Sequence, residues 1–155
     1  REIVDNAVLP IEAVVHGAYE SMICDYNFPA MSLPAYNDLD SPELLDTHYA
    51  FRDEAGGVHS IRIDQYGRSH IYFAKDLCLY PYLEKFNGLG SYRIEAQNYT
   101  ADVTAEIVHI YRAALDRLAA GGDGYRAAEF DRLTEIAPRP LGIGTYRFRQ
   151  SRNSI

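Results

Sequence analysis

Apolar and polar positions follow different patterns in successive parts of this 155-residue chain. Residues 11–17, IEAVVHG, form a short β-branched run that ends at a glycine, which is typical of a buried strand. Between residues 47 and 74, apolar and polar positions alternate in the segments HYAFRDE, VHSIRID and HIYFA, and glycines separate the segments. This period of two predicts an antiparallel β-meander, one face of which carries Tyr49, Phe51, Ile61, Ile63, Ile71 and Phe73.

Residues 75–155 show the helical period instead. A helix-like run at 81–86 ends at glycines, and a compact strand at 91–95 follows it. A long amphipathic helix is predicted from Thr100, which can cap it, to the glycine pair at 121–122. A second helix is predicted over 125–136, before two prolines. Helix, strand and helix joined by short links form a unit of an α/β barrel or a doubly wound sheet.

These patterns divide the chain into three parts. Residues 1–46 hold a helix end at 2–6, one barrel strand and a long loop, because prolines, asparagines and aspartates interrupt residues 18–46. Residues 47–74 form the antiparallel β segment, and residues 75–155 form an α/β block with two C-terminal helices and a tail. The predicted fold class is α+β: the C-terminal part of a TIM-like α/β barrel with an antiparallel β-meander. A complete barrel needs about 250 residues, so we expect an upstream part of the same protein or another subunit to complete it.

The charge and the cysteine content exclude several classes of protein. The net charge of -7 disfavours a general nucleic-acid binder, which needs lysines and arginines to neutralise phosphates. No apolar run has the length of a membrane span, and we expect no secretory signal. Two cysteines, Cys24 and Cys78, make no disulfide framework, so we expect a reduced, cytoplasmic setting.

A series of short motifs lies between Lys75 and Arg112. The segment Lys75-Asp76-Leu77-Cys78 precedes the helix-like run, Ser91, Arg93, Ile94 and Glu95 lie in the strand, and Tyr111-Arg112 lies in the long helix. This order resembles the collagenase-like peptidase family U32, in which S-K-D-L-C, a helix, S-x-K-I-E-G-R and a helix with A-Y-R follow one another. Ala96 and Gln97 depart from the glycine and arginine of that motif. The resemblance implies a peptidase, a hydrolase that acts on a peptide or a small anionic substrate.

The same resemblance bears on a cofactor. In several members of the family, cysteines of the region that corresponds to 18–46 and of the D-L-C segment hold an iron–sulfur cluster. Here Asn27 stands where the family has one of those cysteines, and only Cys24 and Cys78 remain. A cluster needs four ligands, so we expect no cofactor unless ligands come from outside this chain. The missing cysteines disfavour the prephenate-dependent hydroxylases of tRNA or a quinone precursor. A non-catalytic scaffold or heteromer subunit is a further alternative to the peptidase.

Glu95 is the first candidate for a catalytic residue. A carboxylate at the end of a strand inside an α/β core must reach solvent at a cleft or pair with a cation. Arg93 and Arg112 are the candidate cations, and a purely structural ion pair is the alternative interpretation. Arg93 is also a candidate for substrate binding.

Cys78, His16 and Arg139 complete the set of candidates. His16 ends the first predicted strand, and a catalytic pair with Cys78 is one hypothesis. The favoured interpretation of Cys78 is a small buried apolar residue. Arg139 could bind an anionic substrate through its guanidinium group, or it could hold the tail onto the core. No histidine stands at a recognisable metal-binding distance along the chain from either cysteine, and no metal site is predicted.

Overall fold

The computed structural model describes residues 2–31 and 49–147. The chain divides into two compact units. Unit 1 comprises Arg1–Ala18 and Lys75–Ile155, and unit 2 comprises Tyr19–Ala74. Unit 2 is therefore inserted between the first strand of unit 1 and the rest of it.

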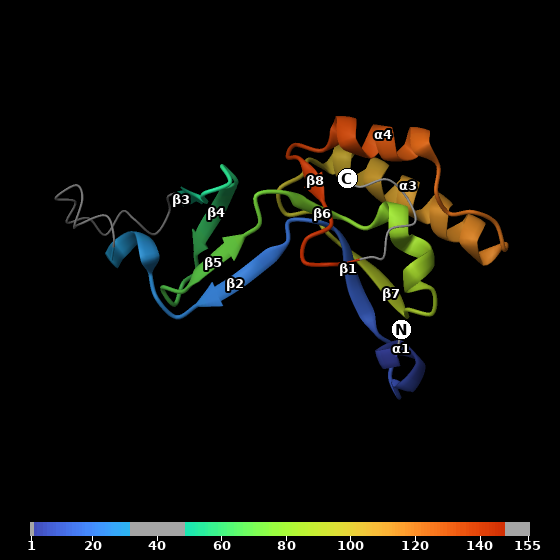
Figure 1. Ribbon diagram of the computed structural model, residues 1–155, viewed down its shortest axis with the longest axis horizontal. Coiled ribbons are helices and arrows are strands. Elements are labelled where there is room, and N and C mark those ends of the chain that lie inside the picture. Colours follow the sequence, from blue (N-terminus) through green and yellow to red (C-terminus); the bar gives the residue numbers. More distant parts are fainter. Residues whose placement is uncertain (1, 32–48, 148–155) are drawn as a thin grey trace. The chain divides into compact units, whose positions relative to one another are not determined.

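Unit 1 contains a mixed four-stranded sheet in the order β7-β1-β6-β8 (Figure 1). Its strands are β1 (Glu12–Gly17), β6 (Asp76–Cys78), β7 (Ser91–Glu95) and β8 (Leu141–Gly142). The pairs β1–β7 and β6–β8 are parallel, whereas β1 and β6 are antiparallel. The helices are α1 (Glu2–Asn6), the 3-10 helix η2 (Tyr80–Phe86), α3 (Ala101–Ala119) and α4 (Ala127–Ile136).

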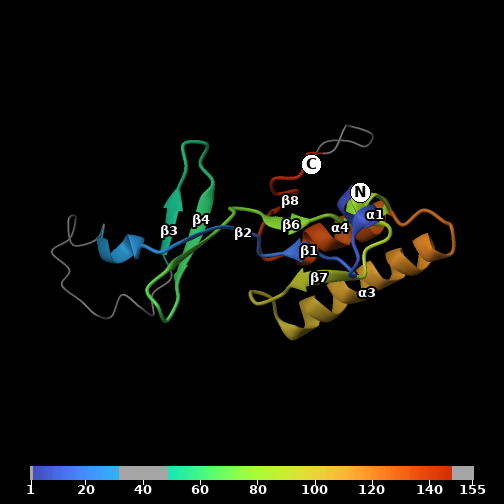
Figure 2. The same cartoon turned by 90° about the horizontal axis from the view of Figure 1, so that it is seen from below.

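The long helix α3 packs on the sheet as its sequence pattern predicts. The Thr100 side chain accepts a hydrogen bond from the backbone N–H of Val103, which caps the helix. The buried stripe of α3 consists of Ile107, Ile110, Tyr111 and Ala114. Figures 1 and 2 show α3 and α4 on the same side of the sheet. One face of the sheet is therefore covered by these two helices.

Unit 2 is an antiparallel sheet in the order β2-β5-β4-β3. The strands are β2 (Glu20–Cys24), β3 (Tyr49–Arg52), β4 (Val58–Ile63) and β5 (Ser69–Tyr72). Ile61 lies opposite Tyr49 on one side and Ile71 on the other, so the predicted apolar face is present. The predicted meander is confirmed.

Two expectations differ from the structure. The TIM-like barrel is not confirmed, because the described residues form two open sheets and β6 runs against β1. Residues 20–24 were expected to lie in a loop, but they form β2, which pairs with β5. Residues 28–31 are helical, and the rest of the predicted loop, 32–46, lies outside the described residues. Within the described part of the chain, no helix is both long and apolar enough to span a bilayer.

Candidate functional site

The carboxyl ends of β1 and β7 approach each other closely at Gly17. This glycine has φ +105°, and a Cβ atom on it would lie 2.0 Å from the carbonyl oxygen of Glu95. The next residue, Ala18, donates its backbone N–H to the same oxygen at 3.3 Å. Glycine at this position therefore fixes Glu95 at the carboxyl end of a parallel strand pair, which is where α/β folds usually place their sites.

The register of the strands puts the candidate side chains on two opposite faces. His16 lies between Cys78 of β6 and Ile94 of β7. Tyr111 of α3 contacts both His16 and Cys78, so these two side chains point toward α3. Because successive side chains in a strand alternate between faces, Glu95 points away from α3. The structure thus brings His16 and Cys78 together and places Glu95 on the other face.

The Tyr111 hydroxyl lies within hydrogen-bonding distance of both His16 and Cys78, and burial favours the neutral form of each. It donates a hydrogen bond to the carbonyl oxygen of Val15 at 3.0 Å, and it lies 3.2 Å from Nδ1 of His16. Since the hydroxyl proton goes to Val15, we infer that Nδ1 of His16 carries the proton that the hydroxyl accepts. Burial lowers the pKa of His16 to about 4.

Cys78 is equally unsuited to nucleophilic chemistry. Its Sγ lies 3.7 Å from the Tyr111 hydroxyl, and the side chain is fully buried. Burial raises the pKa of the Cys78 thiol to about 11. A catalytic cysteine needs a lowered pKa and access to substrate. The geometry is therefore that of a buried structural thiol, the interpretation favoured from the sequence.

A buried carboxylate, Asp76, ties three segments together. Its Oδ2 accepts a hydrogen bond from the Tyr99 hydroxyl at 2.9 Å, and its Oδ1 lies 3.1 Å from Nη1 of Arg139. Its backbone N–H donates to the carbonyl oxygen of Pro140 at 2.9 Å. Burial raises the pKa of Asp76, although Tyr99 and Arg139 oppose this rise. Arg139 thus holds the segment before β8 onto β6, which is the second of the two roles considered for it.

Sequence reasoning did not single out Asp76, Tyr99 or Tyr111 as parts of this network. Two signals were available. Asp76 is a charged residue inside a strand that is otherwise apolar, and buried charges require partners. Tyr111 lies in the apolar stripe of α3, and a buried tyrosine hydroxyl normally finds a hydrogen-bond partner.

The face away from α3 carries a charged row along β1 and β7. The guanidinium group of Arg93 pairs with the Glu95 carboxylate, and its Nη1 lies 3.6 Å from Oε1 of Glu12. The other oxygen of Glu12 accepts a hydrogen bond from the Ser91 hydroxyl at 2.8 Å. The Arg93 side chain is 55% exposed and that of Glu95 is 22% exposed. This row combines a cation and carboxylates within reach of solvent, as peptide binding requires.

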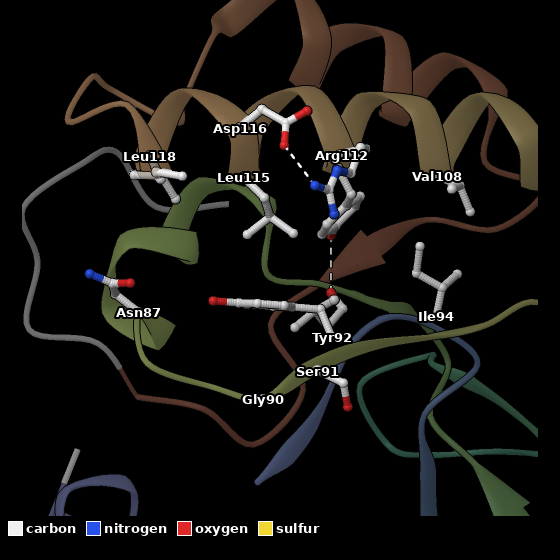
Figure 3. A pocket seen from close by; sticks show the side chains of 13 residues that line it. Asn87, Gly90, Ser91, Tyr92, Ile94, Val108, Arg112, Leu115, Asp116 and Leu118 are labelled. Atoms are coloured by element: carbon white, nitrogen blue, oxygen red, sulfur yellow. Dashed lines mark hydrogen bonds and ion pairs between the residues drawn. The ribbon is translucent and has the colours of Figure 1, made fainter. Parts of the chain in front are cut away.

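A groove lies between α3 and the edge strand β7 (Figure 3). Its volume is about 530 Å³. The ring of Tyr92 lies across it, and an ion pair of 3.0 Å between Arg112 and Asp116 lies on the α3 side. The aliphatic side chains that line it are Val15, Ile94, Val108, Leu115, Leu118 and Ala119.

Within the described part of the chain, the donor groups do not fit an iron–sulfur cluster or a metal ion. The chain has two cysteines, Cys24 and Cys78, whereas a cluster needs four ligands. Among the described residues, no three or more His, Cys, Asp and Glu side chains gather where they could hold a metal. We therefore derive no chemistry through either group.

Fold and site together define a mixed α+β protein with a charged row along a parallel strand pair. The model of peptidase family U32 matches residues 36–154, and the chain belongs to this family. The matched region includes Cys78, Arg93, Glu95 and Arg139, whereas His16 lies outside it. No curated protein and no solved structure matches the chain.

Proposed function

We propose that this chain acts in peptide hydrolysis and that Glu95 and Arg93 contact the peptide. One observation carries the proposal: both side chains stand on the face of β7 that α3 leaves open, with Glu95 at the carboxyl end of the β1–β7 pair and Arg93 paired with it. The other candidates are engaged elsewhere. His16 and Cys78 are fully buried on the α3 face, and Arg139 pairs with the buried carboxylate of Asp76.

The two groups suffice for a general-base hydrolysis. The Glu95 carboxylate takes a proton from water while the water oxygen bonds to the peptide carbonyl carbon. Arg93 donates hydrogen bonds to the oxygen that becomes negative. The C–N bond then breaks, and the departing amine takes the proton back from Glu95. Glu95 thus returns the proton that it took up, and both Glu95 and Arg93 end the reaction in the charge state in which they began.

The test compares Glu95→Gln with wild type in cleavage of gelatin and of a fluorogenic peptide. We expect Glu95→Gln to lower kcat by a factor of at least about a hundred, because the general base is lost. We expect its melting temperature to stay within about 2 °C of wild type, since an ion pair with one solvent-exposed partner contributes little stability. Asp116→Asn is the matched control: it removes an exposed carboxylate from the ion pair with Arg112 on α3 and should leave cleavage unchanged.

Two outcomes would contradict this role of Glu95. Full activity of Glu95→Gln would exclude it as the base. A large loss of stability would instead support the structural ion pair considered from the sequence.

A non-catalytic scaffold is the second candidate. It is favoured by the burial of Cys78 and His16 and by Ala96 and Gln97, which replace the glycine and arginine of the family motif. If the protein is a scaffold, the wild-type chain would cleave no peptide but would still bind one through the Arg93 guanidinium. Calorimetric titration with an uncleaved peptide, compared between wild type and Arg93→Ala, separates the two candidates.

A further inference from the structure

His70 in unit 2 contacts an acidic side chain with each of its two ring nitrogens. It lies in β5, and its Nδ1 is 2.5 Å from Oε1 of Glu20 in β2. Its Nε2 is 3.2 Å from Oδ2 of Asp64, the residue that follows β4. Strands β2 and β4 flank β5 in the sheet (Figure 1). The ring therefore connects β2 to the turn after β4, and we call these three side chains the Glu20–His70–Asp64 bridge.

Both contacts of the bridge are made only by a protonated ring. An ionised carboxylate accepts hydrogen bonds and donates none, so each ring nitrogen must carry a proton. A neutral imidazole has a single N–H, and its other nitrogen would present a lone pair to a negative oxygen. An imidazole is more basic than a carboxylate by about two pKa units, so the proton between His70 and Glu20 stays on the ring.

Asp64 stays ionised because other donors already hold it. Its Oδ2 accepts a hydrogen bond from Nε of Arg68 at 2.7 Å. Its Oδ1 accepts the backbone N–H groups of Tyr66 at 2.9 Å and of Arg68 at 3.0 Å. Burial alone would raise the pKa of Asp64, but these hydrogen bonds hold it well below its usual range. Asp64 therefore supplies no proton to the bridge.

Charged groups reach this part of the sheet from both strands that flank β5. Burial alone would lower the pKa of His70, but hydrogen bonds to two carboxylates and their charges outweigh burial and raise it. The His70 side chain is 21% exposed, so the ring exchanges protons with solvent. The charged groups are Glu20 from β2, Asp25 after it, which attracts Arg68, Arg62 from β4, which is the register partner of His70, and Asp64 and Arg68 from the turn after β4.

We propose that the Glu20–His70–Asp64 bridge is a pH-sensitive connection: the His70 cation holds β2 to the turn after β4, and loss of its proton as the pH rises breaks that connection. Either tautomer of the neutral ring donates to only one of the two carboxylates. The three central side chains of β2 are exposed, so few buried contacts of this strand compensate for the loss. The bridge lies in unit 2 and does not depend on the proposed function of Glu95 in unit 1.

The bridge should act in a different pH range from His16. A histidine whose pKa is higher in the folded chain stabilises the fold below the unfolded pKa, and this stabilisation is lost as the pH rises through the folded pKa. For His70 the range therefore begins at 6.5 and extends upward. The pKa of His16 falls from 6.5 to about 4, so His16 acts below 6.5. The two effects can therefore be measured separately in one protein.

The first experiment follows the ring nitrogens of His70 by nitrogen-15 NMR in the full chain between about pH 5 and 9, with His70→Gln to assign the signals. We expect a titration midpoint above that of the same histidine in the urea-unfolded chain. Glu20→Gln removes one carboxylate and should lower the midpoint by at least about half a pH unit. Glu54→Gln is the matched control, because Glu54 is exposed and precedes β4, whereas the bridge lies at the other end of that strand. It should leave the midpoint unchanged.

The second experiment measures hydrogen exchange of the β2 amides at about pH 6.5 and 8.5, corrected for the intrinsic rate at each pH. In wild type we expect the protection of these amides to fall at least about threefold at the higher pH. In His70→Gln the protection should already be low at the lower pH and should not change further. The amides of β3, which is separated from β5 by β4 in the sheet order, are the internal control and should respond alike in both proteins.

A midpoint at or below that of the unfolded chain would overturn the cationic bridge. Equal protection of β2 in wild type and His70→Gln at both pH values would overturn its role in holding β2. Should His70→Gln fail to fold, the shift of the midpoint between wild type and Glu20→Gln, compared with Glu54→Gln, still decides whether the bridge exists.

Discussion

Tyr111 joins the two side chains that sequence reasoning paired as a catalytic dyad. Its hydroxyl lies within hydrogen-bonding distance of His16 and Cys78 and is itself anchored to the carbonyl oxygen of Val15. Both side chains are buried around it, and burial favours the neutral form of each. A buried histidine and thiol that stay neutral contribute to folding stability rather than to catalysis.

We predict that His16 makes the protein sensitive to acid. Its pKa falls from 6.5 to about 4 in the folded protein. Between these values the unfolded chain binds a proton at His16 that the folded chain does not, so stability decreases as the pH falls. Above pH 6.5 His16 is neutral in both states and costs no unfolding free energy. The loss of unfolding free energy grows as the pH falls and reaches about 3 kcal/mol at pH 4.

Urea unfolding of wild type and His16→Gln between pH 7 and 4 measures this contribution. The variant should be less stable at neutral pH but should show a shallower dependence on pH over this range. Identical slopes for the two proteins would contradict a buried neutral His16.

Cys78 should be unreactive in the folded protein. Because burial raises its pKa to about 11, almost no thiolate is present at neutral pH. Ellman's reagent at pH 8 should label only the half-buried Cys24 in native protein, and both thiols in denaturant. Cys24→Ser should abolish native labelling, whereas labelling of Cys78 at the rate of a free thiol would disprove its burial.

At the scale of elements, Gly17 is the described glycine at which an added Cβ would lie closest to another atom. A side chain there would meet the backbone of Glu95, and φ +105° is itself unfavourable for other residues. We predict that Gly17→Ala costs at least about 3 kcal/mol of unfolding free energy. Gly56→Ala is the matched control, with φ +86° and no atom within 4 Å of an added Cβ, and should cost about 1 kcal/mol. Thermal unfolding checks both, and equal losses would show that the contact with Glu95 is unimportant.

Elements with strong local patterns could be predicted, and those defined by distant partners could not. The strand 91–95 and the helix that begins after Thr100 carry their own period and cap, and both are present. Strand β2 was missed because most of its side chains are exposed and its partner β5 lies about 50 residues away. Pairing over such a distance leaves no local signal in the sequence.

The candidate site was predictable only in part for the same reason. The motif drew attention to Glu95 and Arg93, and the structure places them together on an open face. Sequence spacing could not show that Cys78 pairs with His16 whereas Glu95 pairs with the next residue, Gly17, so that the two side chains point to opposite faces. The Asp76 network joins residues from three segments, so it could be recognised only after folding brought them together.

At the scale of the whole molecule, strand direction decides the architecture. A helix, strand and helix in sequence suggested a parallel barrel, but the order of elements does not fix which way neighbouring strands run. Unit 2 separates β1 from β6, and these two strands meet antiparallel. The parallel pair β1–β7 remains, and it carries along its length the charged row on which the proposed function depends.

The most direct measurement is a crystal structure of Glu95→Gln with an uncleaved peptide bound, because the variant retains the site but lacks the proposed base. We predict a peptide carbonyl or carboxylate oxygen within hydrogen-bonding distance of the Arg93 guanidinium, on the face away from α3. A peptide bound against Cys78 and His16, or one that leaves Arg93 untouched, would contradict the account.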